Sequence, residues 1–181
     1  MKDFAIRITL LLAVLTLLGQ SAASGAQSQV ITYPFPAGLP ASNRFHVTVD
    51  EKAVFTHAAE VADFAMFAIR PPVQVTVACE QAVTSAVVRP RSRNIVPQWD
   101  ARSVRFTVDG PGPLSVEING QIRPALLLFI DPPEESALTP DAPNVVRFAG
   151  CQLHEAGEIR LADDQTLYLE PGAVVRGTVS L

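Results

Sequence analysis

Paired acidic side chains are the first residues in this sequence that could perform chemistry. Asp163 and Asp164 are adjacent, and cleavage of a glycosidic bond requires two carboxylates at a set separation. Their setting, "ADDQT" between two short apolar runs, is equally suited to a turn, because Asp readily adopts turn geometry. Glu134 and Glu135 lie in a proline-rich stretch, where we expect them to be solvated. We favour the turn and predict no catalytic residue in this chain.

The three histidines are the next candidates, since a histidine exchanges protons near neutral pH. His154 is followed by Glu155, but no second acid and no nucleophile accompanies the pair in the pattern. His46 lies in an alternating run and His57 in a stretch of small residues, and neither has a partner that the sequence identifies. We therefore favour a structural role for His154, where a new apolar pattern begins.

An arginine-rich stretch with a nearby tryptophan is a candidate binding site. "RPRSRN" contains Arg89, Arg91 and Arg93, and Trp99 follows shortly after. Guanidinium groups bind carboxylates through two parallel hydrogen bonds, and an indole stacks on the face of a sugar ring. The alternative is a surface loop rich in arginine, whose tryptophan plugs an edge of the fold. We favour the loop and keep the four residues as a candidate carbohydrate contact.

Two cysteines, Cys79 and Cys151, leave two alternatives open. In an exported protein they can form one disulfide, which would close a long loop and stabilise the fold by about 3 to 5 kcal/mol. Two buried free thiols are the other alternative. Neither cysteine has a second ligand at a metal-binding spacing, and the sequence contains no phosphate-binding glycine loop and no Ser/His/Asp order. We expect no metal and no cofactor.

The amino terminus has the three parts of an export signal. A lysine and an arginine precede the apolar run Ile8–Gly19, and small residues follow through Ala26. The apolar run is shorter than the ~20 residues of a spanning helix, which disfavours an uncleaved membrane anchor. We expect residues 1–26 to be a signal peptide, cleaved after Ala23 or Ala26. The mature protein would be secreted or periplasmic, without stable membrane association.

The charge of the mature chain argues against an anionic partner. The chain has 14 basic and 18 acidic residues. Loss of Lys2, Arg7 and Asp3 with the signal peptide leaves 12 basic and 17 acidic residues, a formal charge of −5. A nucleic-acid-binding domain usually carries a basic patch or stripe. The sequence therefore predicts neither nucleic acid nor an anionic membrane as a partner.

Short alternating apolar runs predict an all-β fold. From Val30 onward these runs are separated by proline and glycine, of which the whole chain has 15 and 10. In a strand, every second side chain points to the same face. Three successive runs with this period should direct nine residues into one shared core: Val73, Val75, Val77, Val104, Phe106, Val108, Leu114, Val116 and Ile118.

Two further apolar runs are predicted to be strands. "HAAEVADFAMFAI" is rich in alanine and could form a turn or two of helix, but Phe64, Met66 and Ala68 alternate, and we favour a strand over Asp63–Ile69. "ALLLFI", at Ala125–Ile130, is apolar on both faces. We expect it to be a central strand that is covered on both sides.

The spacing of strands changes after a proline-rich acidic stretch. "DPPEESALTPDAPN" has no period and resembles a linker or a long surface loop. The runs after it are very short and closely spaced, as in the coils of a solenoid. We therefore predict a β-sandwich-like domain over 27–131, a linker or surface loop over 132–144, and the first coil or coils of a solenoid over 145–181.

These segments resemble a known family. "HEAGEIRLADDQTLYLEPGAVVRGTVSL" is similar to the entry into the right-handed parallel β-helix of polygalacturonase-type glycoside hydrolases, including the dextranase and isopullulanase branch. "VVRPRSRNIVPQ", "VRFTVDGPGPLSVEING" and "LLLFIDPPEE" resemble the β-sandwich module that precedes the helix in those enzymes. The match spans residues 30–181. The resemblance implies an N-terminal β-sandwich followed by the start of a right-handed parallel β-helix, truncated after about one coil.

The resemblance also implies a polysaccharide as partner. The catalytic aspartates of the family lie on later coils, so none can be assigned to a residue of this sequence. We expect the amino-terminal part of a secreted, polygalacturonase-like polysaccharide hydrolase without catalytic residues of its own. The alternative is a complete, non-catalytic module that binds carbohydrate or has a structural role. Uncovered apolar residues near Leu181 should make the chain associate with other copies.

Overall fold

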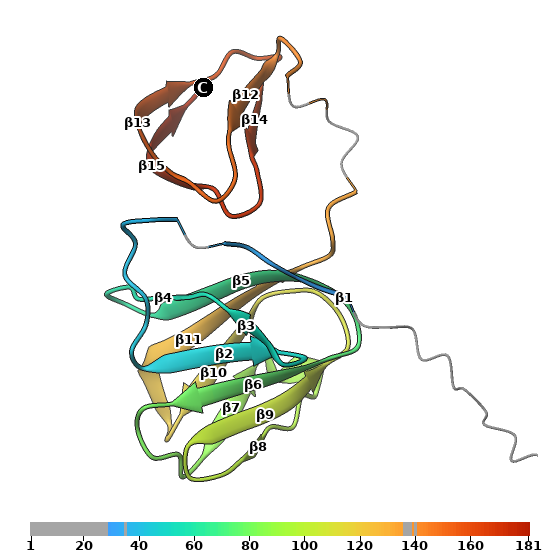
Figure 1. Cartoon of the computed structure of the whole chain (residues 1–181), viewed down its shortest axis with the longest axis vertical. Helices are drawn as coiled ribbons and strands as arrows, with labels where there is room; N and C mark the ends of the chain where they lie inside the picture. Colours follow the sequence, from blue (N-terminus) through green and yellow to red (C-terminus); the bar gives the residue numbers. More distant parts are fainter. Residues whose placement is uncertain (1–28, 35, 136–138, 140) are drawn as a thin grey trace, which may run out of the picture.

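The computed structural model describes residues 29–34, 36–135, 139 and 141–181 (Figure 1). Its regular structure in these residues is β-strand, apart from one short 3-10 helix, η1 (Arg91–Arg93). The predicted all-β class is confirmed. The segment predicted as a signal peptide lies outside the described residues. Within them, no helix is long and apolar enough to cross a membrane.

A six-stranded sheet forms one layer of the fold. The strand over Asp63–Ile69 that the alternation predicted is confirmed as part of β5 in this sheet. All its pairs are antiparallel except β5 with β11. β4 lies beside β5, on the edge that β5 also shares with β1. The strand order is β1 (Gln29–Thr32), β5 (Asp63–Arg70), β11 (Gln121–Asp131), β10 (Leu114–Ile118) and β7 (Ala86–Arg89), with β4 (Thr56–His57) off this path.

A five-stranded antiparallel sheet forms the second layer. Its order is β3 (Lys52–Val54), β2 (Phe45–Val49), β6 (Val73–Cys79), β9 (Ser103–Val108) and β8 (Gln98–Trp99). Two tight hairpins set the register of their strands. The loops between β2 and β3 and between β10 and β11 are the residue pairs Asp50-Glu51 and Asn119-Gly120, all four with positive φ, as two-residue hairpins with the twist of their strands require.

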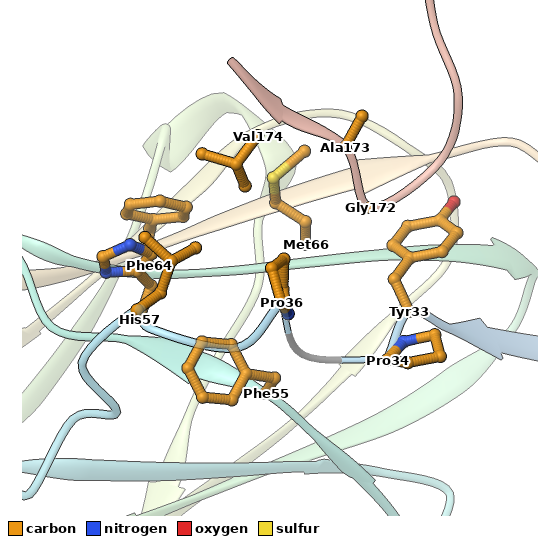
Figure 2. Close-up of a pocket in the computed structure, with 11 residues that line it drawn as sticks. Tyr33, Pro34, Pro36, Phe55, His57, Phe64, Met66, Gly172, Ala173 and Val174 are labelled. Atoms are coloured by element: carbon orange, nitrogen blue, oxygen red, sulfur yellow. The ribbon is translucent and has the colours of Figure 1, made fainter. Parts of the chain in front are cut away.

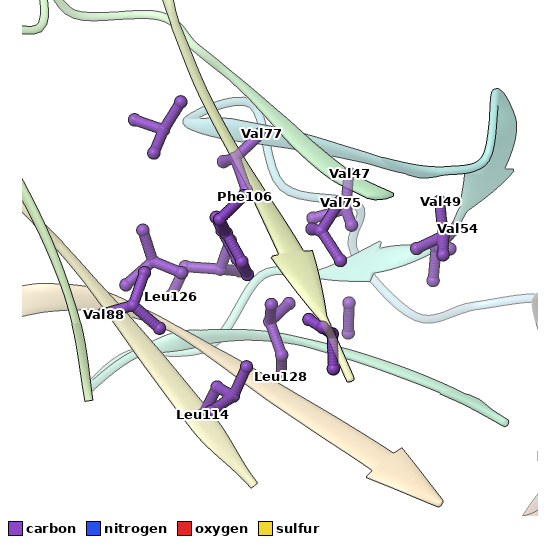
Figure 3. Close-up of a cluster of buried hydrophobic side chains, with 14 of the residues drawn as sticks. Val47, Val49, Val54, Val75, Val77, Val88, Phe106, Leu114, Leu126 and Leu128 are labelled. Atoms are coloured by element: carbon purple, nitrogen blue, oxygen red, sulfur yellow. The ribbon is translucent and has the colours of Figure 1, made fainter. Parts of the chain in front are cut away.

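The two sheets pack face to face around one core (Figure 3). The nine residues that the period of two directed to a shared core are all buried in it, so this prediction is confirmed. They come from β6 and β9 in one sheet and from β10 in the other. Side chains from most of the other strands fill the remaining space, among them Val47 and Val49 of β2 and Leu126 and Leu128 of β11.

One charged cluster lies at the edge of this core. The carboxylate of Asp63, which is 0% exposed, forms an ion pair with Arg44. Its Oδ2 accepts a hydrogen bond of 2.6 Å from Ser42 Oγ, and its Oδ1 accepts one of 3.2 Å from the amide of Ala59. Among the described residues, no buried side-chain nitrogen or oxygen lacks a hydrogen-bond partner. The cluster therefore fastens the start of β5 to the segment before β2.

The expectation that Ala125–Ile130 is covered on both faces is wrong for one face. β11 is central, between β5 and β10, and its inner side chains Leu126, Leu128 and Ile130 are buried. On the outer face Leu127 is half-buried and Phe129 is 40% exposed. The reason is that the described residues beyond this sheet cover its outer face only in part, and Met66, opposite Phe129 on β5, is likewise 42% exposed.

The carboxyl-terminal strands stack as two parallel coils. β12 (Val145–Phe148) pairs with β14 (Thr166–Leu169), and β13 (Leu153–Arg160) pairs with β15 (Val174–Ser180). Partners are 21 positions apart throughout the first pair and up to Glu155 in the second, and 20 apart from Gly157 onward, after a shift in register. Ion pairs between the coils join Arg176 to Glu155 and Arg147 to Glu170.

The coils lie beside the six-stranded sheet at its β5 end (Figure 1). The turn before β15 approaches Tyr33, which follows β1: a Cβ built on Gly172 would lie 3.0 Å from the Cβ of Tyr33. The segment between sheet and coils contacts both sides, because Glu135 pairs with Arg70 and Glu134 accepts a hydrogen bond from Tyr168. The division of the chain into domains remains a prediction.

Candidate functional site

Side chains on the outer face of the six-stranded sheet form two rows. In one row Arg89 of β7 lies opposite Ser115 of β10, Ser115 opposite Leu127 of β11, and Leu127 opposite Phe64 of β5. In the next row Phe129 lies opposite Met66. Because successive side chains alternate between faces, all these residues share one face. An apolar strip thus leads from β5, where the coils lie, to an arginine on β7.

The β5 end of this face is the contact with the coils (Figure 2). A small cavity of about 50 Å³ remains there between Phe64, Met66 and the turn at 172–174. His57 stacks on Phe64 with ring centroids 4.7 Å apart, and its Nδ1 lies 2.7 Å from the carbonyl oxygen of Ala58. The lining is almost entirely apolar and aromatic, so this contact serves packing.

The β7 end of the same face holds an open groove of about 520 Å³. Pro90, Pro113, Leu127 and Phe129 give it an apolar surface, and Arg89 and Arg91 add two guanidinium groups. Ser115 contributes a hydroxyl group. The combination of an exposed aromatic ring, cations and a hydroxyl group is suited to a polar ligand that also has an apolar face.

The two arginines of the groove differ in whether a neighbouring side chain binds their guanidinium group. Arg89 donates a hydrogen bond of 2.5 Å from Nε to Oε1 of Glu117, which is buried on the neighbouring strand. This hydrogen bond, and then the charge of Glu117, raise the pKa of Arg89 above its ordinary value. Arg91 is exposed, and its guanidinium has no hydrogen bond or ion pair with any described residue. Arg91 is therefore free to bind a ligand.

Of the four predicted carbohydrate contacts, the groove brings together only Arg89 and Arg91. Arg93 instead donates hydrogen bonds of 2.7 Å and 3.0 Å to the carbonyl oxygens of Gly110 and Pro111. Trp99 lies on β8, an edge strand of the other sheet, and is 48% exposed. The aromatic side chain of the groove is Phe129, which sequence reasoning assigned to the interior because its run is apolar on both faces.

The acidic pairs lie outside this groove. Asp163 and Asp164 form the exposed turn between β13 and β14, which agrees with the favoured turn. The turn is closed by a hydrogen bond of 3.0 Å from the amide of Gln165 to the carbonyl oxygen of Ala162. The described residues contain no group of three or more His, Cys, Asp or Glu side chains that could hold a metal ion.

The histidine near the start of β13 has a structural environment. His154 Nε2 lies 2.8 Å from the carbonyl oxygen of Ala149. Its ring packs edge-on against Phe148, with centroids 5.1 Å apart. Glu155, its neighbour in the sequence, pairs with Arg176 on the second coil. These contacts join one coil strand to the next and support the structural role that the sequence favoured.

Both cysteines are free thiols in the structure. Of the two alternatives, the disulfide is therefore not formed in it. Cys79 ends β6 inside the core between the sheets. Burial, and then the charge of Asp100, raise its pKa to about 11. Cys151 is half-buried at the turn between β12 and β13, with Sγ 3.7 Å from the carbonyl oxygen of Pro171. The two thiols thus belong to different packing environments.

A solved structure resembles this arrangement of sheets and coils. It is the glycoside hydrolase Dex49A from Penicillium minioluteum, a dextranase, with a TM-score of 0.58 and 15% sequence identity. The match covers 81% of this chain and 45% of Dex49A, so the chain spans less than half the length of that enzyme. No family model and no curated protein matches the chain. The likeness supports a relation in fold between this chain and a glycoside hydrolase.

Proposed function

We propose that this chain is the amino-terminal portion of a secreted, polygalacturonase-like polysaccharide hydrolase. In this proposal residues 27–131 form a β-sandwich, residues 132–144 connect it to the coils, and residues 145–181 start a parallel β-helix. The catalytic carboxylates lie on further coils, outside residues 1–181. The partner of the whole protein is a polysaccharide.

The observation that carries this proposal is the order of the layers along the chain. Two packed sheets are followed by two coils, whose paired positions are 20 or 21 residues apart. The fold of this chain is similar to that of Dex49A over 81% of the chain. The environments of five acidic residues agree with catalytic carboxylates that lie on further coils. Glu134, Glu135 and Glu155 have partners in the structure, and Asp163 and Asp164 form a turn.

The groove at Arg89 and Arg91 favours a second candidate function. A non-catalytic module that binds carbohydrate needs only a surface with an aromatic platform and hydrogen-bond donors, and the groove provides both. The two functions make different demands on the coding sequence downstream of Leu181. The enzyme requires further coils, whereas the binding module requires none.

Sequencing the genomic DNA across the codon for Leu181 separates the two functions. The proposal expects a continuation, in frame or after a frameshift, with short apolar runs spaced by roughly one coil of 20 to 25 residues. It also expects acidic residues at the ends of such runs. A coding region without such runs contradicts the proposal and favours the binding module.

Export is a separate part of the proposal with its own test. The chain should be expressed with its first 26 residues in a host that secretes proteins, and the mature amino terminus should be read by mass spectrometry. We expect it to begin after Ala23 or Ala26 and to be found outside the cytoplasm. Material that retains Met1 and stays with the membrane contradicts export by a cleaved signal peptide.

A further inference from the structure

One asparagine of the chain has a sequence context that favours chemical modification. Among the asparagines, only Asn119 precedes a glycine. In such a pair the backbone nitrogen of the glycine can attack the side-chain Cγ of the asparagine, because glycine has no side chain to hinder a close approach. Ammonia leaves, a succinimide ring forms, and water opens the ring to aspartate or isoaspartate. Asn119 is therefore the residue of this sequence most suited to deamidation.

The loop between β6 and β7 holds the side chain of Asn119. Its Oδ1 accepts hydrogen bonds of 2.7 Å from the amide of Thr84, 2.9 Å from Thr84 Oγ1 and 3.2 Å from the amide of Ser85. Its Nδ2 donates one of 2.7 Å to the carbonyl oxygen of Ala82. We call these four hydrogen bonds the Asn119 clasp. The clasp fastens residues 82–85 to the hairpin between β10 and β11, and the carboxamide cannot rotate without breaking it.

The backbone of this hairpin directs the attacking nitrogen away from the side chain. Asn119 and Gly120 have φ of +55° and +71°. Positive φ at both positions of a two-residue hairpin defines a type I′ turn, with ψ of about +30° at the first position. Ring closure requires the nitrogen of Gly120 to eclipse the Cβ of Asn119, at a ψ of about −120°, as in a type II′ turn. The peptide between the two residues must therefore rotate by about 150° before the nitrogen reaches Cγ.

The donors around Oδ1 do not by themselves start the reaction. Three N–H and O–H groups that converge on one oxygen resemble an oxyanion hole, and they would stabilise the charge that develops on Oδ1 during attack. Such stabilisation has an effect only when the nucleophile lies within reach of the reacting carbon. Because the type I′ turn keeps the nitrogen of Gly120 away, the clasp only holds the side chain in place. Modification therefore depends on opening of the hairpin.

We propose that Asn119-Gly120 is a deamidation site that the folded hairpin protects and that local opening exposes. In the open hairpin the backbone nitrogen of Gly120 gives its proton to solvent and bonds to Cγ of Asn119. The side-chain nitrogen takes up a proton and leaves as ammonia. Water then adds to one carbonyl carbon of the succinimide and breaks its bond to nitrogen. Addition at Cγ gives aspartate, and addition at the main-chain carbonyl gives isoaspartate.

Neither product restores the clasp. Aspartate can still accept from Thr84 and Ser85, but it has no N–H group for the carbonyl oxygen of Ala82 and places a negative charge beside it. Isoaspartate adds one carbon to the main chain of a two-residue turn, whose length sets the register of β10 with β11. β7 begins at Ala86, directly after the clasped loop, and pairs with β10. The conversion thus loosens the β7 edge of the six-stranded sheet, and refolding does not reverse it.

Incubation of the purified chain, folded in buffer and unfolded in guanidinium chloride at the same pH and temperature, measures the protection. Peptide mapping by mass spectrometry reports the exchange of NH₂ for OH, and chromatography separates isoaspartate from aspartate. We expect Asn119 to convert at least about tenfold more slowly in the folded chain. Conversion that is equally fast in both states, or faster in the folded chain, overturns the proposal. An Asn119 that stays unmodified in the unfolded chain overturns it as well.

Two threonine substitutions test the clasp. Thr84→Ala removes the hydrogen bond from Oγ1 and should speed the conversion of folded protein severalfold. Thr107→Ala, at an exposed threonine of β9, is the matched control and should leave the rate unchanged. Circular dichroism establishes that both variants are folded, and equal rates in the two contradict a role for the clasp.

The effect of the product on stability has its own measurement. Protein that was converted while unfolded and then refolded should unfold at a lower denaturant concentration than Asn119→Asp, because only the converted protein contains isoaspartate. Coincident unfolding curves contradict the loss of register at the hairpin.

Discussion

Gly172 and Tyr33 approach so closely that a Cβ atom at position 172 would push against its neighbours. A Cβ atom on Gly172 would lie 3.0 Å from the Cβ of Tyr33 and 3.1 Å from the Sγ of Cys151. The contact joins the turn before β15 to the segment after β1, which belong to the coils and to the six-stranded sheet. Glycine at this position therefore permits the coils to pack against the sheet.

Gly172→Ala should loosen this packing, and Gly157→Ala is its matched control. Both glycines have positive φ, +79° and +62°, so both substitutions carry a similar backbone cost of about 1 to 2 kcal/mol. Only Gly172 has neighbours in the way of a new Cβ, whereas Gly157 has nothing within 4 Å. Urea unfolding should show about 1 to 3 kcal/mol of additional destabilisation for Gly172→Ala. Equal losses in the two variants would contradict a close contact.

Asp63→Asn should destabilise the fold by about 3 kcal/mol, because it leaves Arg44 without its buried counter-charge. The matched control is Asp109→Asn, since Asp109 pairs with Arg93 at 3.4 Å but is exposed. Exposed ion pairs contribute at most about 1 kcal/mol. Thermal and urea unfolding of both variants measure the difference. A loss of stability for Asp63→Asn as small as that of the control would show that the charged cluster does not stabilise the fold.

The same carboxylate makes stability depend on pH. Burial opposes the charged form of Asp63, but hydrogen bonds from Arg44, Ser42 and Ala59 outweigh it and hold its pKa below the ordinary value. A lowered pKa in the folded state gives stability that is present at neutral pH and is lost as pH falls from about 4 through the folded pKa. The wild type should lose more stability than Asp63→Asn between neutral and acidic pH. Parallel curves for the two proteins would exclude this role.

The two thiols should react differently. Burial and the nearby charge of Asp100 raise the pKa of Cys79 to about 11, and only the thiolate is nucleophilic. A thiol reagent at neutral pH should therefore modify Cys151 in the folded protein and both cysteines after denaturation. Peptide mapping by mass spectrometry identifies the labelled residues. Denatured protein that takes up the label only after reduction would establish a disulfide instead.

The outer edge of the second coil should promote association. Among the described strands, β15 pairs only with β13, its Val179 is 50% exposed, and Arg176 is its one charged residue. Unpaired strand edges without lysine or proline tend to join other chains. Val179→Lys should lower the apparent mass in light scattering. Val96→Lys, at a loop valine that is 82% exposed, is the control and should not lower it.

The alternation of apolar residues was sufficient to predict the core strands. Val75, Phe106 and Val116 come from three runs, and all point into one interior, because a period of two fixes which side chains share a face. The same pattern cannot identify the neighbours of a strand. The parallel pairing of β5 with β11 joins segments more than 50 residues apart and follows from packing.

The candidate site was predicted only in part for a similar reason. The sequence offered Arg89, Arg91 and Arg93 as a candidate carbohydrate contact beside the favoured surface loop, with Trp99 as the aromatic partner because it is close in the chain. Trp99 belongs to the other sheet, and Phe129 reaches the groove from β11. Whether the outer face of a central strand is covered depends on the layer packed against it. An apolar run alone does not contain that information.

The most direct test of the account is an assay of glycoside hydrolysis by the purified, folded chain. Reducing ends should be measured after incubation with polygalacturonate and, separately, with dextran. In the proposed function the catalytic carboxylates lie outside residues 1–181, so we expect no release above that of a buffer control. Release of reducing ends by the wild type that is abolished in Asp163→Asn would contradict it, because the turn between β13 and β14 would then carry the catalysis.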